Sequence, residues 1–183
     1  MVLVALLCRA QRIDAVVYFN CSRAGTASYT RFVPVDQLPR QIVGAAIVDS
    51  LTHPTRLLAA RRTAPEQFAG MWEFPGGKVE AGETDTAALH RELLEELGVE
   101  VELGAEIVGP VPGGWALNER AVMRVWLAEV TTGEPRPLED HDVLSWVPLA
   151  GSTELVDLAW IPADRPIVDA VLTKTCHAGA AQQ

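Results

Sequence analysis

Residues 76–99 read GGKVEAGETDTAALHRELLEELGV, in which a glycine-rich loop leads into an amphipathic helix. Thr84 is a good N-cap residue, and Asp85 follows it where the helix dipole favours an acidic group. Gly98 is typical of the residue at which a helix ends. At about 100° per residue, the leucines fall on one arc, which we predict to be the buried face: Leu89, Leu93, Leu94 and Leu97.

The same helix carries three carboxylates, Glu92, Glu95 and Glu96, on a separate arc. Carboxylates three and four residues apart on a helix are neighbours and repel each other. A solvated acidic face is one interpretation, but no lysine lies between Glu92 and Glu96 to relieve the repulsion. The glycines before the helix let the backbone approach a ligand closely, and hard cations such as Mg²⁺ take carboxylate oxygens as ligands. The stretch therefore predicts a divalent-cation site.

Composition narrows the class of protein. The chain has 183 residues, of which 49% are hydrophobic, so it can build one core without disulfides or metals as supports. Its formal net charge is −9, which argues against nucleic-acid polymers and anionic membranes as partners. The sequence contains no apolar run of 18 residues that would predict a membrane span.

The N-terminus and the cysteines point to a cytoplasmic protein. The opening residues, MVLVALLCRA, carry no basic residue before their apolar run, so we predict no signal peptide. The three cysteines, Cys8, Cys21 and Cys176, form no CxxC pair and are typical of free thiols in a reducing cytosol.

Three parts are expected along the chain: an N-terminal extension of unknown role at 1–40, one domain at 41–175, and a flexible tail at 176–183. Within the extension, 15–19 reads as a strand and 22–28 as a polar linker. In the domain, apolar or alternating runs predict strands at 41–48, within 52–62, at the start of 72–77, and at 99–109, 120–130 and 143–149. The first two would form a hairpin. Helices are predicted at 84–97 and 162–174, which favours an α/β (α+β) fold with a mixed sheet between helices.

Residues 77–99 resemble the Nudix box, G-x5-E-x7-R-E-U-x-E-E-x-G-U, where U is aliphatic. The fixed positions are all met: Gly77, Glu83, Arg91, Glu92, Leu93, Glu95, Glu96, Gly98 and Val99. A looser similarity to the MutT-type branch extends from about 41 to 174. The resemblance implies an α/β/α sandwich that hydrolyses a nucleoside diphosphate linked to another moiety.

The resemblance also implies roles for the residues of the box. The ligands of Mg²⁺ or Mn²⁺ would be Glu92, Glu95, Glu96 and the carbonyl of Gly77, or of Gly76 before it. Glu83 would support the metal ligands or the activation of water. Arg91 would orient the glutamates through ion pairs.

The segment WEFPGGKVEAGE resembles the MutT-type nucleoside triphosphate pyrophosphohydrolases, in which water attacks the β-phosphorus to give a monophosphate and pyrophosphate. The resemblance implies that Arg62, at the end of the second strand, contacts phosphate; a solvated strand-end arginine is the alternative. Asp140, or Glu139 beside it, would supply a further acid near the metals, with a plain polar turn as the alternative. The histidines are expected at the surface: His53, His90, His141 and His177.

Four further residues match the substrate-binding part of the branch. Glu73 and Phe74 would line the base pocket, and Lys78 would contact the substrate. Asp164 stands where the 8-oxoguanine-specific archetype has asparagine. An aspartate can accept from N4 of cytosine or from N1 and N2 of guanine, and it can also act as the N-cap of the closing helix.

The expected activity is therefore Mg²⁺-dependent hydrolysis of (deoxy)nucleoside triphosphates, with 8-oxo-dGTP as the first candidate substrate and nucleotide-pool sanitisation as the role. A CTP, dCTP or 5-methyl-dCTP pyrophosphatase is the alternative. A non-catalytic nucleotide-sensing Nudix module is an alternative of another class, although such modules tend to lose box carboxylates and this chain keeps all of them. Either a monomer or a homodimer is compatible with the sequence.

Overall fold

The computed structural model describes residues 15–18, 31–34, 39–151 and 153–180, and the chain divides into two compact units, 1–39 and 40–183. In the first unit, β1 (Ala15–Tyr18) and β2 (Arg31–Pro34) form an antiparallel pair. The strand predicted at 15–19 contains β1. The polar linker predicted at 22–28 lies outside the described residues.

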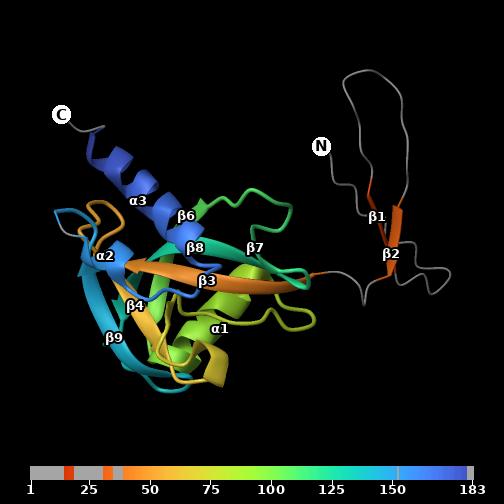
Figure 1. Ribbon diagram of the computed structural model, residues 1–183, viewed down its shortest axis with the longest axis horizontal. Coiled ribbons are helices and arrows are strands. Elements are labelled where there is room, and N and C mark those ends of the chain that lie inside the picture. Colours follow the sequence, from red (N-terminus) through yellow and green to blue (C-terminus); the bar gives the residue numbers. More distant parts are fainter. Residues whose placement is uncertain (1–14, 19–30, 35–38, 152, 181–183) are drawn as a thin grey trace. The chain divides into compact units, whose positions relative to one another are not determined.

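The described part of the second unit is built on a mixed sheet of seven strands, ordered β5-β4-β3-β8-β6, with β7 paired to β8 and β9 to β4 (Figure 1). The strands are β3 (Arg40–Val48), β4 (Arg56–Arg62), β5 (Trp72–Glu73), β6 (Glu100–Ile107), β7 (Trp115–Asn118), β8 (Ala121–Thr132) and β9 (His141–Pro148). Strands β3 and β8 are parallel along the whole of β3, whereas the other pairs are antiparallel. The predicted mixed sheet is confirmed.

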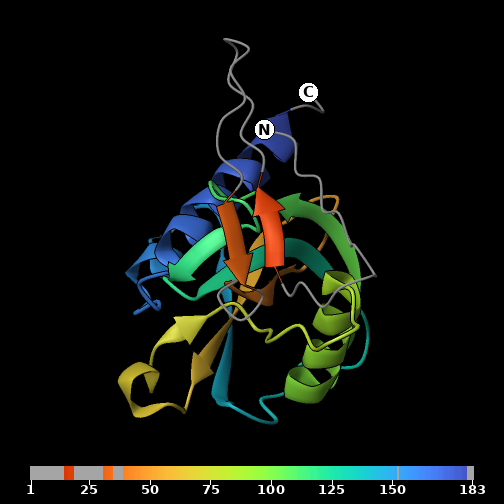
Figure 2. The same ribbon diagram turned by 90° about the vertical axis from the view of Figure 1, so that its right-hand side faces the viewer.

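Helices cover both faces of this sheet (Figures 1 and 2). They are α1 (Asp85–Leu97), the short α2 (Glu154–Asp157) and α3 (Arg165–Ala180), together with a 3₁₀ turn (Glu66–Phe68). Successive side chains of a strand point to opposite faces. Accordingly, Val43 and Ala45 of β3 belong to the core that α1 covers, and Ala46 and Val48 belong to the core that α3 covers. The architecture is the predicted α/β/α sandwich.

The hairpin predicted for the first two strands of the domain is present only at its turn. Strands β3 and β4 pair at Val48 and Leu57 and then separate. Beyond that point the loop at 75–79 takes the free edge of β3, where Ala45 donates to the Pro75 carbonyl at 2.9 Å and Val79 donates to the Gln41 carbonyl at 3.1 Å. The separation places the glycine-rich loop inside the sheet layer rather than on top of it.

Helix α1 begins and ends where the sequence predicts. Thr84 accepts a hydrogen bond from the Ala87 N–H, and Gly98 adopts a left-handed conformation with φ 70°. The predicted buried face is wrong at one position, because Leu94 is 54% exposed and Glu96 is only 6% exposed. On the helical wheel Glu96 lies about 20° from Leu89, whereas Leu94 lies about 100° from Leu93, beyond the reach of the sheet.

Two short elements, β7 and α2, were not predicted, because four residues are too few to show a periodic pattern. Helix α3 continues to Ala180, so residues 176–180 of the predicted tail are helical. Alanine, which the segment contains at 178 and 180, is the best helix former. Among the described residues, no helix combines the length and apolar character needed to cross a membrane.

Candidate active site

A cavity of about 420 Å³ opens where β3 and β4 separate. Nine of the twelve site residues predicted from the sequence line it: Arg62, Glu73, Phe74, Gly77, Lys78, Glu92, Glu96, Asp140 and Asp164. The other three, Glu83, Arg91 and Glu95, form an ion-pair cluster on and before α1. The topology thus brings together residues that lie up to about a hundred positions apart in the chain.

The glycine loop is pressed against its neighbours too tightly for any side chain. Gly76 has φ 146°, and a Cβ there would lie 2.1 Å from the carbonyl oxygen of Val43. A Cβ on Gly77 would lie 2.3 Å from the carboxyl carbon of Glu92. The Gly77 carbonyl accepts from the Val43 N–H at 2.9 Å, whereas the Gly76 carbonyl accepts none of the hydrogen bonds found among the described residues. The Gly76 carbonyl is therefore the freer of the two candidate metal ligands.

One guanidinium relieves the repulsion between the helix carboxylates. Arg91 donates to both oxygens of Glu83 at 2.9 and 3.1 Å, and its Nη1 lies 3.1 Å from Glu92 and 3.0 Å from Glu95. Its Nη2 also donates to the Lys78 carbonyl at 3.1 Å. The hydrogen bonds from Arg91 hold the pKa of Glu83 below its ordinary value. Arg91 thereby ties α1 to the glycine-rich loop.

Glu96 is the buried carboxylate of the set. Its Oε2 accepts from the Gly76 N–H at 3.0 Å. Burial raises its pKa to about 7, and Glu73 and Glu92 add to this rise, while His141 and the Gly76 N–H oppose it. A cation in the cavity would favour the ionised form of Glu96. Glu95, by contrast, faces outward on the ion-pair cluster and does not line the cavity.

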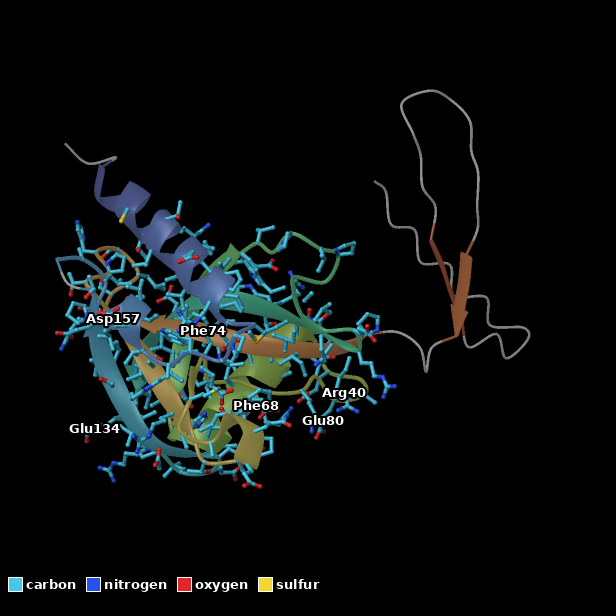
Figure 3. All side chains as sticks on the ribbon, in the orientation of Figure 1. Arg40, Phe68, Phe74, Glu80, Glu134 and Asp157 are labelled. Atoms are coloured by element: carbon cyan, nitrogen blue, oxygen red, sulfur yellow. The ribbon has the colours of Figure 1, made fainter. Side chains whose placement is uncertain are left out.

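Asp164 lines the same cavity together with apolar side chains such as Phe74 and Ile161. The ring of Phe74 stacks on Trp160 at 5.2 Å, and Figure 3 places Phe74 within the body of the domain, whereas Glu134 lies at its margin. Asp164 is buried, and its Oδ2 accepts from the Phe74 N–H at 3.3 Å. Burial raises the pKa of Asp164 to about 7, with the neighbouring Glu73 adding to the rise.

Arg62 and Glu73, which both line the cavity, form a partly buried ion pair. Nη1 of Arg62 lies 2.8 and 3.0 Å from the oxygens of Glu73, and its Nη2 lies 3.3 Å from Asp140. His141 Nε2 lies 2.9 Å from Oε1 of Glu73. Glu73 therefore lines the cavity as predicted, but both of its oxygens already have partners.

The expectation that His141 lies at the surface is wrong, because its side chain is fully buried. Simple alternation along β9 could not have found it, because the pairing with β4 shifts register between Val143 and His141 and places His141 opposite Arg62. Val147 belongs instead to the core that α3 covers. Arg40 and Phe68 also line the cavity, although the sequence did not single them out (Figure 3).

Comparison with known proteins agrees with this geometry. The NUDIX domain family matches residues 38–171, most of the chain. The chain belongs to the Nudix family.

Relatives place it in the MutT-type branch of these hydrolases. A Mycobacterium tuberculosis protein named "Putative 8-oxo-dGTP diphosphatase 2" is 44% identical over 140 residues, covering 76% of this chain and 92% of that protein. The CTP pyrophosphohydrolase of Escherichia coli K12 is 33% identical over 136 residues, covering 71% of this chain and 90% of that protein. The crystal structure of a MutT NUDIX hydrolase from Burkholderia pseudomallei is 34% identical with a TM-score of 0.56, covering 73% of this chain and 98% of that one.

Nudix hydrolases generally use divalent metals, and the donor set of this chain fits one. Among the described residues, no group of three or more acidic, histidine or cysteine side chains is arranged so that it could hold a metal ion by itself. Mg²⁺ needs fewer protein ligands than that, because it is usually bound by one or two carboxylates together with waters and substrate phosphates. Glu92 and Glu96 line the cavity beside the unengaged Gly76 carbonyl, and all of these donors are the oxygens that a hard cation prefers.

Proposed function

We propose that this Nudix hydrolase cleaves nucleoside triphosphates to the monophosphate and pyrophosphate, with Mg²⁺ as its cofactor and Mn²⁺ as a substitute. The observation that carries the proposal is that one cavity is lined by groups of two kinds. They are the carboxylates Glu92, Glu96 and Asp140, and the aromatic Phe74 beside the buried Asp164. Its volume of about 420 Å³ is within the range of pockets that bind small ligands.

Glu92, Glu96 and the Gly76 carbonyl would hold the metal. When bound, it supplies neutralisation of the polyphosphate charge and a water of lowered pKa. Arg62 would contact a phosphate with the guanidinium edge that now faces Asp140. Asp140, exposed at the rim of the cavity, would accept a proton from the attacking water. Arg91 and Glu83 would keep the box carboxylates in place.

For the base, 8-oxo-dGTP leads, which would make the protein a nucleotide-pool sanitising enzyme. An ionised Asp164 presents two acceptors, which suit the N1 and N2 hydrogens of a guanine. The mycobacterial relative is named "Putative 8-oxo-dGTP diphosphatase 2". The nucleotide pool on which such an enzyme acts also supports a cytoplasmic location.

A cytosine nucleotide is the second candidate, and a specific observation favours it. The pKa of Asp164 is about 7, so a protonated carboxyl group is accessible near neutral pH. Such a group donates one hydrogen bond and accepts another, which matches N3 and N4 of cytosine. One relative is named a CTP pyrophosphohydrolase.

One panel tests these alternatives. Pyrophosphate release would be measured with Mg²⁺ and with EDTA for 8-oxo-dGTP, dGTP, dCTP, CTP, 5-methyl-dCTP and ADP-ribose. We expect release from triphosphates only, abolished by EDTA, with 8-oxo-dGTP the best substrate. If a cytosine nucleotide gives the highest rate, the preferred substrate is the second candidate. Binding of triphosphates without any pyrophosphate release would instead indicate a non-catalytic sensor.

A further inference from the structure

We propose that His141 is a positioning residue of the phosphate site, which holds Glu73 so that Glu73 in turn aims Arg62 into the cavity. The inference rests on the proposed function, because it takes Arg62 to be a phosphate ligand. It adds a residue outside the Nudix box that the sequence led us to place at the surface.

The contacts form a chain from a buried ring to the cavity. His141 Nε2 lies 2.9 Å from Oε1 of Glu73, and Nη1 of Arg62 lies 2.8 Å from the same oxygen. Nη2 of Arg62 lies 3.3 Å from Asp140 at the cavity rim. Because both His141 and Arg62 contact the Glu73 carboxylate, they fix its orientation. The carboxylate in turn orients the Arg62 guanidinium that it binds.

The two nitrogens of the His141 ring differ in their hydrogen-bond partners, and Nε2 is the one that contacts Glu73. An ionised carboxylate only accepts hydrogen bonds, so Nε2 carries the proton that it donates to Glu73. Nδ1 is the one buried side-chain nitrogen or oxygen among the described residues that has no hydrogen-bond partner. A histidine kept for stability alone would be expected to satisfy both nitrogens, because an unpaired buried polar atom costs free energy.

The backbone around His141 is held without help from its ring. Thr63 donates to the Asp140 carbonyl from its N–H at 2.8 Å and from its hydroxyl at 3.0 Å. Strand β9 pairs with β4 from His141 to Pro148. Loss of the imidazole should therefore leave the loop and the strand in place and release mainly the side chain of Glu73.

Replacing His141 with glutamine or with asparagine distinguishes the roles of the two ring nitrogens, because each amide places its N–H donor at the position of a different one. In His141→Gln the amide nitrogen lies as many bonds from Cβ as Nε2 does, so it can still donate to Glu73. In His141→Asn the nitrogen lies at the place of Nδ1, where the wild type has no partner. For the best triphosphate of the panel we expect His141→Asn to raise KM about tenfold with kcat changed less than threefold, and His141→Gln to stay within threefold of wild type in both.

Thermal unfolding of both variants checks that the folded population is equal at the assay temperature. Equal kinetics for the Gln and Asn variants, whether impaired or normal, would overturn the proposal, because a merely structural role does not depend on which end of the ring carries the donor. A loss confined to kcat would overturn it as well, because Arg62 would then not be the group affected.

A double-mutant cycle with Glu73 tests the route. In a Glu73→Ala background, His141→Asn should change KM by less than twofold, because the carboxylate through which it acts is gone. An unchanged tenfold effect would contradict the chain of contacts.

His53→Asn, at an exposed turn between β3 and β4, is the matched control and should behave as wild type. If the wild-type protein hydrolyses no triphosphate, the proposed function itself is refuted. If the wild type and the variants are active but His141→Asn and His141→Gln have equal kinetics, only the role of His141 is refuted.

Discussion

Arg91 shows how one residue can offset the repulsion between the carboxylates of an acidic helix. It contacts three of the four box glutamates, and its bonds to Glu83 and to the Lys78 carbonyl fix it in place. Glu96, the fourth, has no such partner and is buried against the Gly76 N–H. Repulsion is thus left at Glu96, a buried carboxylate that lines the cavity, where a metal would remove it.

The residue-scale test of this reading is Glu96→Gln. We expect kcat for the best triphosphate to fall at least a hundredfold, because a metal ligand is lost. Stability of the metal-free protein at pH 8 should be unchanged or higher, because an ionised buried carboxylate with a raised pKa is replaced by a neutral group. Steady-state kinetics and urea unfolding measure the two effects. Glu100→Gln, on the exposed start of β6, is the control, and equal activity of both variants would refute the assignment.

Asp164 predicts a pH dependence of stability. Its pKa is about 7 in the folded protein and 3.8 ordinarily, so between about pH 4 and 7 the folded state binds a proton that the unfolded state does not. The free energy of unfolding contributed by this group is therefore fully present below pH 4 and is lost as pH rises through 7. As pH rises through this range, the free energy of unfolding of Asp164→Asn should fall by about 2–4 kcal/mol less than that of the wild type. Urea unfolding without metal at pH 5 to 8 measures it, and parallel wild-type and variant curves would contradict it.

At the scale of elements, the site depends on β5, the glycine loop and α1 acting as one unit. The ends of α1 could be predicted, because Thr84 and Gly98 are local signals. The exposure of Leu94 and the burial of Glu96 could not, because they depend on how far the sheet reaches around the helix. Nor could the separation of β3 from β4, since it comes from a loop 30 residues downstream competing for the edge of β3.

Two glycine substitutions test this unit. In Gly77→Ala the three atoms nearest the new methyl group all belong to the Glu92 carboxylate, so we expect activity to fall more than tenfold with little loss of stability. In Gly76→Ala it meets the Val43 backbone at a φ that alanine rarely adopts, so we expect more than about 2 kcal/mol of destabilisation. Gly82→Ala shares a positive φ but has open space around it, and it should cost about 1 kcal/mol. Similar stability losses in all three variants would contradict the close contacts.

For the whole molecule, the net charge of −9 and the polyphosphate substrate appear incompatible until a divalent cation is included. The box residues and the architecture could be predicted because their signals are contiguous or periodic. The buried His141 and its bond to Glu73 join residues 68 positions apart, and only the fold brings them together. For the same reason the sequence could not show that Asp164, whose contact with the base stays a prediction, is buried beside Glu73.

If the cavity directs water to the β-phosphorus of a nucleoside triphosphate, the oxygen of that water must end in the pyrophosphate. Hydrolysis of the best substrate in ¹⁸O-labelled water with Mg²⁺, followed by mass spectrometry of both products, tests it most directly. We expect one labelled oxygen in pyrophosphate and none in the nucleoside monophosphate. Label in the monophosphate, or release of inorganic phosphate in place of pyrophosphate, would contradict it.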